Sequence, residues 1–67
     1  MTMQKVKELV SHIRAELHDA DEYARQAAMI HEDDRQLSDM YAKLAGEELE
    51  HAHMEHEQAV KIIKAYK

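Results

Sequence analysis

The chain has 67 residues, a formal net charge of −5 and no cysteine. The missing cysteines exclude disulfides, thiolate metal sites and redox dithiols, and the negative charge argues against nucleic acid or an anionic membrane as a partner. No apolar run approaches the ~20 residues that span a bilayer, and the start MTMQKVKELV lacks the apolar core of a signal peptide. We therefore expect a soluble, cytoplasmic protein.

Apolar residues recur at helical spacing from Met3 to Ile30 and predict a first helix over about residues 3–30. At about 100° per residue they form one stripe. The stripe consists of Val6, Leu9, Val10, Ile13, Leu17, Ala20, Ala24, Ala27 and Ala28. Because its second half is almost all alanine, we expect another helix to pack closely against residues 20–28.

The helical pattern fails in HEDDRQ, residues 31–36, although this segment contains neither glycine nor proline. Asp33 and Gln36 have the spacing of a capping box. We therefore expect a turn at about residues 31–34 and a second helix over about residues 35–66. The alternative is one continuous helix through this segment.

The pattern of two long amphipathic helices bears on how the chain assembles. A chain of this size without disulfides usually needs a metal, an oligomer or both, and one hairpin cannot cover its own apolar surface. Two hairpins together close a core as a four-helix bundle. We expect an all-α protein of one domain, residues 1–67. It would be an antiparallel two-helix hairpin that forms a homodimer or a higher homo-oligomer.

The stretch AGEELEHAHMEHEQ, residues 45–58, crowds glutamate and histidine into four helical turns. On a helical wheel Glu48, His51 and Glu55 fall on the apolar stripe of the second helix. The other members of that stripe are Leu37, Tyr41, Leu44, Ala59, Ile62 and Tyr66. The far side of the helix carries Glu47, Glu50, His53 and Glu57. Most of the run is thus a solvated face, but part of it points inward.

Glu48 and His51 have two interpretations. Glu48 could extend to solvent from a loosely packed interface, and His51 could be a neutral core histidine bonded to a neighbouring carbonyl or carboxylate. The two residues lie three apart, however, and project side by side. A bound cation is one of the few partners that compensate a buried carboxylate. Carboxylate oxygen with imidazole nitrogen suits iron, manganese or zinc better than calcium or magnesium.

The first helix offers a third ligand in Glu16, at the edge of its apolar stripe, although Glu16 could also be solvated. Tyr23 lies two turns further along the same edge. His12 and Asp19 flank Glu16 on the polar side, where they could support a ligand or belong to the surface. Glu55 remains open, as a ligand of an extra ion or a hydrogen-bonding group.

The ordered set Glu16-x₆-Tyr23 and Tyr41-x₆-Glu48-x-x-His51-Ala52 resembles one half of a ferritin-like di-iron carboxylate protein. The pattern is similar to that of the two-helix encapsulated ferritins and of the four-helix domain of rubrerythrins. The resemblance implies that Glu48 bridges two metal ions, that Glu16 and His51 are terminal ligands, and that Tyr23 and Tyr41 form hydrogen bonds nearby. Such a site needs a glutamate from each of two helices and Glu-x-x-His from each of the other two. One chain holds half of that set, and a two-fold homodimer would complete it.

The resemblance also implies a function. It implies a di-iron centre, with manganese or zinc as alternative ions, and oxidation of Fe(II) by dioxygen or peroxide, that is, a ferroxidase or peroxide-reducing activity. Rubrerythrins carry a further cysteine-ligated iron site, for which this chain has no cysteine. The alternative is a helical dimerisation or adaptor module that keeps the ferritin-like shape without metal, with which Gly46 beside the motif is compatible.

Overall fold

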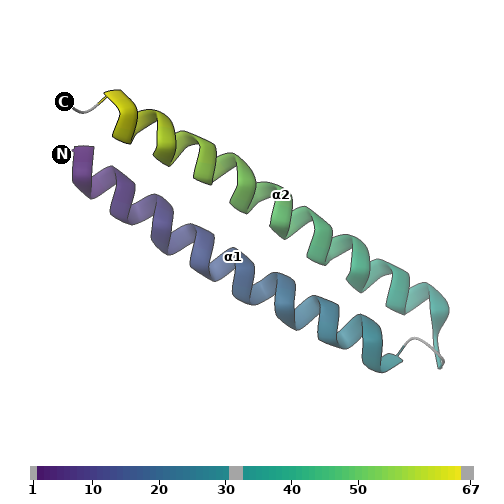
Figure 1. Ribbon diagram of the computed structural model, residues 1–67. Coiled ribbons are helices and arrows are strands. Elements are labelled where there is room, and N and C mark those ends of the chain that lie inside the picture. The colour runs from purple at the N-terminus through teal and green to yellow at the C-terminus, as the bar shows by residue number, and fades with distance from the viewer. Residues whose placement is uncertain (1, 31–32, 66–67) are drawn as a thin grey trace.

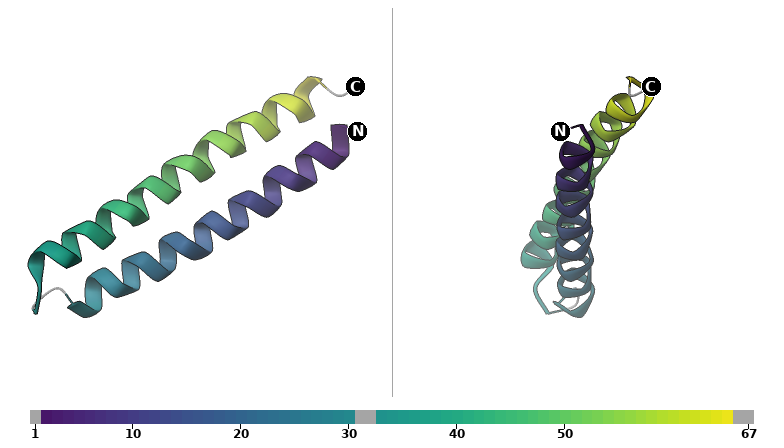
Figure 2. Two further views of the ribbon diagram at one scale, coloured as in Figure 1. Left: turned by 180° about the vertical axis from the view of Figure 1, so that it is seen from behind. Right: turned by 90° about the vertical axis from the view of Figure 1, so that its left-hand side faces the viewer.

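Two antiparallel helices make up the described structure, a computed structural model that covers residues 2–30 and 33–65 (Figure 1). Helix α1 spans Thr2–Ile30 and helix α2 spans Arg35–Ala65, with no strand in the described residues. The helices lie side by side along a rod whose Cα atoms extend over 53 × 14 × 10 Å (Figure 2). The all-α prediction is confirmed, and the alternative of one continuous helix is wrong because the chain reverses. Neither helix is apolar enough over its described length to cross a bilayer.

The turn between the helices ends at an aspartate cap. Oδ1 of Asp34 accepts a hydrogen bond from the backbone N–H of Leu37 at 3.0 Å, the contact that an N-cap side chain makes with the third helical residue. The expectation that Asp33 caps α2 is therefore wrong by one residue. The N–H groups of Asp33 and Asp34 instead donate to the carbonyl of Ile30 and close the end of α1. Residues 31 and 32, which begin the predicted turn, and Tyr66, at the predicted end of the second helix, lie outside the described residues.

Each helix faces the other through residues spaced alternately by three and four, which we call the inner face. This spacing is the seven-residue repeat of packed helix pairs. On α2 the repeat places small residues at every seventh position, and they are buried: Ser38, Ala45, Ala52 and Ala59. Between them lie Tyr41, Glu48, Glu55 and Ile62. The inner face of α1 consists of Leu9, Ile13, Glu16, Ala20, Tyr23, Ala27 and Ile30. Small side chains at the contact let helix axes approach closely.

The inner face differs from the stripes expected from the sequence. Ala20 is buried and Ala27 half-buried as expected, but Ala24 and Ala28 are exposed because Tyr23 takes the intervening inner position. On α2 the centre of the contact lies at the small residues, and Leu37 is exposed at its edge. On α2 the bulky Leu37 thus marks the edge of the interface, and the alanines mark its centre.

The hairpin has little apolar core of its own. Among the described residues Leu9 is the one large apolar side chain that is buried, and no large side chain is fully buried. Many leucine, methionine and other large apolar residues are exposed: Met3, Val10, Leu17, Met29, Leu37, Met40, Leu49, Met54 and Ile63. An isolated hairpin therefore leaves most of its large apolar side chains in water.

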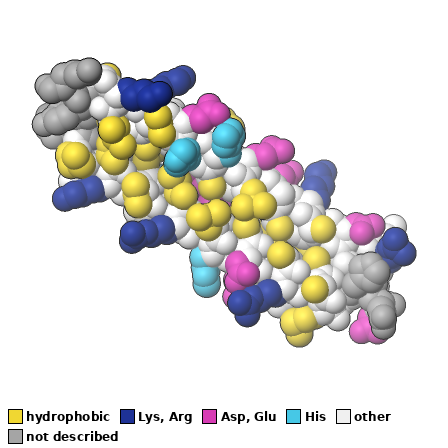
Figure 3. All heavy atoms as spheres, viewed as in Figure 1, with side chains coloured by type: hydrophobic (Ala, Val, Ile, Leu, Met, Phe, Trp, Pro, Cys, Tyr) yellow, Lys and Arg dark blue, Asp and Glu magenta, His cyan; other side chains and the backbone are white. Residues whose placement is uncertain are grey.

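Several of these side chains form a strip along one side of the hairpin (Figure 3). On each helix they follow an inner-face position by one residue, as Leu17 follows Glu16 and Leu49 follows Glu48, and so point about 100° away from it. Because the helices are antiparallel, these positions lie on the same side of the rod. We call this the outer strip; it consists of Val10, Leu17, Leu49 and Ile63, together with Met3, seven residues before Val10 on the same side of α1.

Candidate metal centre

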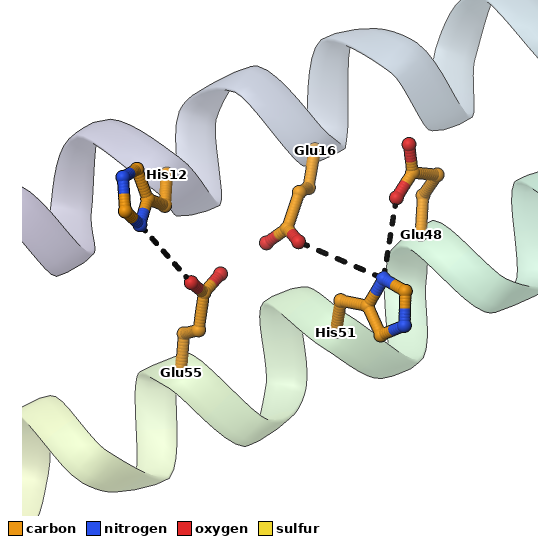
Figure 4. Close-up of polar contacts among 5 residues, drawn as sticks. All are labelled: His12, Glu16, Glu48, His51 and Glu55. Carbon is orange, nitrogen blue, oxygen red and sulfur yellow. Dashed lines mark hydrogen bonds and ion pairs between the residues drawn. The ribbon is translucent and has the colours of Figure 1, made fainter.

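Glu16 of α1 meets Glu48 and His51 of α2 half-way along the rod (Figure 4). Each residue offers one ligand atom, and the three atoms lie within 4.8 Å of one another. Nδ1 of His51 is 3.4 Å from Oε1 of Glu48 and 3.7 Å from Oε2 of Glu16. The structure thus brings together the three residues that the sequence predicts as ligands. We call them the ligand cluster.

The turn fixes the register that assembles this cluster. Near the turn, Oγ of Ser38 donates a 2.7 Å hydrogen bond to the carbonyl of Ala27. One turn further, the rings of Tyr23 and Tyr41 pack with their centroids 6.0 Å apart. The same antiparallel register continues toward the open end of the hairpin and brings the ligand cluster together. A different loop length would pair different residues.

The two carboxylates of the cluster occupy inner-face positions. The side chains of Glu16 and Glu48 are each only 21% exposed, whereas the ring of His51 is 59% exposed. His51 precedes the inner position Ala52 by one residue, which places it on the side of the rod opposite the outer strip. We call this the ligand side. The cluster is therefore closed by the hairpin on one side and open on the other.

Glu55 and His12 lie one turn beyond the cluster on the same side of the rod (Figure 4). Glu55 is an inner-face residue with a side chain 23% exposed, and its Oε2 lies 3.3 Å from Nδ1 of His12 across the two helices. The sequence left Glu55 open and placed His12 on the polar side of α1. The sequence did not predict the contact between His12 and Glu55, because it depends on the register of the two helices. Glu55 follows Glu48 by seven residues, and this spacing indicates that Glu55 also points inward.

Two carboxylate oxygens at this site have no partner. Oε1 of Glu16 and Oε1 of Glu55 are closed to solvent and accept no hydrogen bond from any described residue. The pKa of Glu16 is raised above its ordinary value, first by a side-chain hydrogen bond with Glu55, which needs a protonated carboxyl, and then by burial and by repulsion from Glu55 and Glu48, against the attraction of His51. Two ionised carboxylates cannot bond to each other, so each lacks a partner when both are charged. A bound cation would satisfy both.

The other candidates lie apart from the cluster. Tyr23 and Tyr41 pack on each other, and in the described chain neither hydroxyl forms a hydrogen bond with the ligand cluster. Their role as hydrogen-bonding neighbours of a metal stays a prediction. Asp19 is exposed. The side chains of His53 and Glu57 form an exposed ion pair at 2.7 Å along α2, away from the cluster.

Comparison with protein-family models, with curated proteins and with solved structures gave no match to this chain. The geometry of the site and the chemistry of its side chains therefore carry the functional argument. Two carboxylates and an imidazole, with unpartnered buried oxygen beside them, are a donor set that fits iron, manganese or zinc.

Proposed function

We propose that two copies of this chain bind a pair of transition-metal ions, iron or manganese, at a carboxylate centre between them. The observation that carries the proposal is the convergence of Glu16, Glu48 and His51 from both helices within 4.8 Å. Two carboxylates and one imidazole are three protein ligands per chain, too few to hold two ions. A second copy would supply the same three, and the four glutamates together would offset the charge of two divalent ions.

The exposed side chains on the ligand side support a partner there. His51 is 59% exposed there, beside a row of apolar residues on α2 that includes the exposed Leu37 and Met54. A second copy on this side would cover these residues and bring its own ligand cluster to the first. In this arrangement Glu48 would be shared between the two ions, and Glu16 and His51 would be the terminal ligands. The result is a four-helix bundle built from two hairpins.

The outer strip supports assembly beyond that dimer. It lies on the opposite side of the rod, so a partner on the ligand side leaves it in water. Its apolar side chains recur at seven-residue steps along α1, from Met3 to Val10 to Leu17, the pattern of a helix packed against another. We propose that another copy covers this strip, so that the protein is a higher homo-oligomer.

When bound, an iron pair supplies redox chemistry, and the reaction that we propose is oxidation of Fe(II) by dioxygen or peroxide. The residues of the chain would hold the ions, orient them through Glu48 and, once paired, shield them from bulk water. The test is anaerobic titration with Fe(II), with the mass of the intact assembly measured, followed by exposure to air. We expect uptake of at least one ion per chain and a near-UV band of oxo-bridged iron after oxidation.

The second candidate function is an adaptor module that associates through its apolar surfaces without metal. The exposed apolar residues on both sides of the rod favour it. The Fe(II) titration described above distinguishes this function from the first candidate. A stable assembly that takes up far less than one ion per chain and develops no near-UV band would be an adaptor.

A further inference from the structure

His12 and Glu55 form a second histidine–glutamate pair beside the ligand cluster. They come from opposite helices, 43 residues apart in sequence, and their Nδ1 and Oε2 atoms lie 3.3 Å apart. Figure 4 shows Glu16 between this pair and the pair formed by His51 and Glu48. The hairpin therefore carries a row of five donors in which Glu16 is central.

The two oxygens of Glu16 face different neighbours. Its Oε2 lies toward His51, at 3.7 Å. Its Oε1 is closed to solvent and has no hydrogen-bond partner among the described residues, and the same holds for Oε1 of Glu55. A surface carboxylate pair would turn these oxygens to water. Here the inner-face positions of both residues keep them covered, so that when both carboxylates are ionised their charge is offset by a bound cation.

We propose that His12, Glu16 and Glu55 hold a second divalent transition-metal ion on each chain, with the Glu16 carboxylate shared between this ion and the one at Glu48 and His51. This proposal deepens the proposed metal-binding function and rests on it. Two carboxylates with one imidazole repeat the donor set of the first position. In the dimer, the two additional ions flank the central pair along the rod.

The position is open to an ion from solution. The ring of His12 is 66% exposed. The other two residues, Glu16 and Glu55, line an open pocket together with His51, Met54 and Gln58. The His53–Glu57 pair provides the matched comparison, because it has the same two residue types at 2.7 Å but lies along one helix with both side chains exposed. A histidine–glutamate pair without a covered third carboxylate gives no such site.

The test is equilibrium binding of Co(II), followed by its visible absorption and by metal analysis per chain. Four proteins are compared with the wild type: Glu55→Gln, His12→Ala, Glu48→Gln and the control His53→Ala. We expect two ions per chain in the wild type and in the control. We expect about one in Glu55→Gln and in His12→Ala, with loss of the absorption of one Co(II) environment. His12 is exposed, so its removal tests the site even where Glu55→Gln does not fold.

Two outcomes separate the proposals. One ion per chain in the wild type, retained in Glu55→Gln and His12→Ala but lost in Glu48→Gln, overturns the second position and leaves the proposed function standing. Uptake that is absent in the wild type, or that no substitution other than His53→Ala reduces, overturns both.

Discussion

Glu16 and Glu55 lie on facing helices, and each has one carboxylate oxygen that is closed to solvent and without a hydrogen-bond partner in the described chain. Both residues occupy positions where a packed helix pair ordinarily has leucine or isoleucine. The arrangement disfavours the metal-free state and favours cation binding. Substitutions that remove one of these carboxylates should therefore stabilise the metal-free protein and weaken metal uptake.

Replacing Glu55 with glutamine should stabilise the metal-free protein. The amide can donate a hydrogen bond to the carboxylate of Glu16, and one negative charge is removed. A net gain of about 1 kcal/mol for such a bond corresponds to a rise in melting temperature of roughly 4–8 °C in a chain of this size. Thermal melts in the presence of a chelator measure this. Glu57→Gln, which changes an exposed glutamate on the same helix, is the control and should leave the melting temperature nearly unchanged.

Replacing Glu48 with leucine should abolish stabilisation by metal. Ions that bind only the folded assembly contribute ~2.7 kcal/mol at a hundredfold excess over Kd, and Glu48 is the proposed bridge between them. The metal-free variant should be as stable as the wild type or more so, since a buried charge is removed. Melts with and without Mn(II) or Fe(II) under anaerobic conditions separate the two effects. A metal-induced shift of wild-type size in Glu48→Leu would show that Glu48 is not a ligand, and Glu50→Leu, on the solvated face, should keep that shift.

Dissociating the proposed dimer should release metal without any change of ligand. Leu37 is exposed on the ligand side, two heptads from His51. Leu37→Lys should weaken that contact at least tenfold, which is about 1.4 kcal/mol, and should lower metal content in parallel. Leu49→Lys, on the outer strip, should reduce the size of the assembly but leave the metal-bound dimer. Sedimentation and metal analysis of the same fractions measure both. Full metal retained by a monomer of Leu37→Lys would contradict a shared site.

A larger side chain on the inner face should disrupt the metal centre without any change of a ligand. Ala52 is buried between the helices beside His51, and Ala52→Leu should separate them at a cost of about 1–3 kcal/mol. Because Glu16 lies on the opposite helix, the same substitution should lower metal affinity. Ala42→Leu, at an exposed position of α2 on the side of the outer strip, is the matched change. Equal metal binding by the two variants would mean that the close approach of the helices is not needed.

Gly46 should tolerate alanine with a gain in stability. It lies inside α2 without a positive φ, and no atom lies within 4 Å of the position that a Cβ would occupy. Alanine in a helix interior is more favourable than glycine by roughly 0.5–1 kcal/mol. Denaturant unfolding at fixed protein concentration measures the change. Gly46 follows the inner-face Ala45 by one residue and so lies on the side of the outer strip. A destabilised Gly46→Ala would therefore indicate that the proposed partner on that side packs closely on this part of α2.

The extent to which the sequence predicted this structure differs between its features. The two helices and the turn follow from apolar periodicity, but the cap was assigned to Asp33 because Gln36 completes a capping box, whereas Asp34 makes the contact. The ligand cluster could be predicted from the sequence because its members lie near the apolar stripes. The His12–Glu55 contact could not, since a helical wheel treats each helix alone and the cross-helix register depends on the turn.

The small residues of α2 illustrate a second limit. A stripe drawn through the bulkiest side chains centres on Leu37, but Ser38, Ala45, Ala52 and Ala59 form the contact. A hydrophobic pattern gives most weight to large apolar side chains. Two helix backbones approach most closely, however, where the side chains between them are smallest. The alanine repeat therefore indicates the hairpin contact, and the exposed leucines and methionines are the side chains that the proposed contacts with other chains would cover.

The alanine-lined interior has a consequence for the lifetime of the chain. Little apolar surface is removed from water within one hairpin. In the proposed assembly, association would therefore supply much of the free energy of folding, and the folded fraction would depend on chain concentration. A newly made chain would then remain open to proteases until it met another copy. Degradation would then remove unassembled chains selectively, and metal that tightens the assembly would lengthen the half-life of the protein.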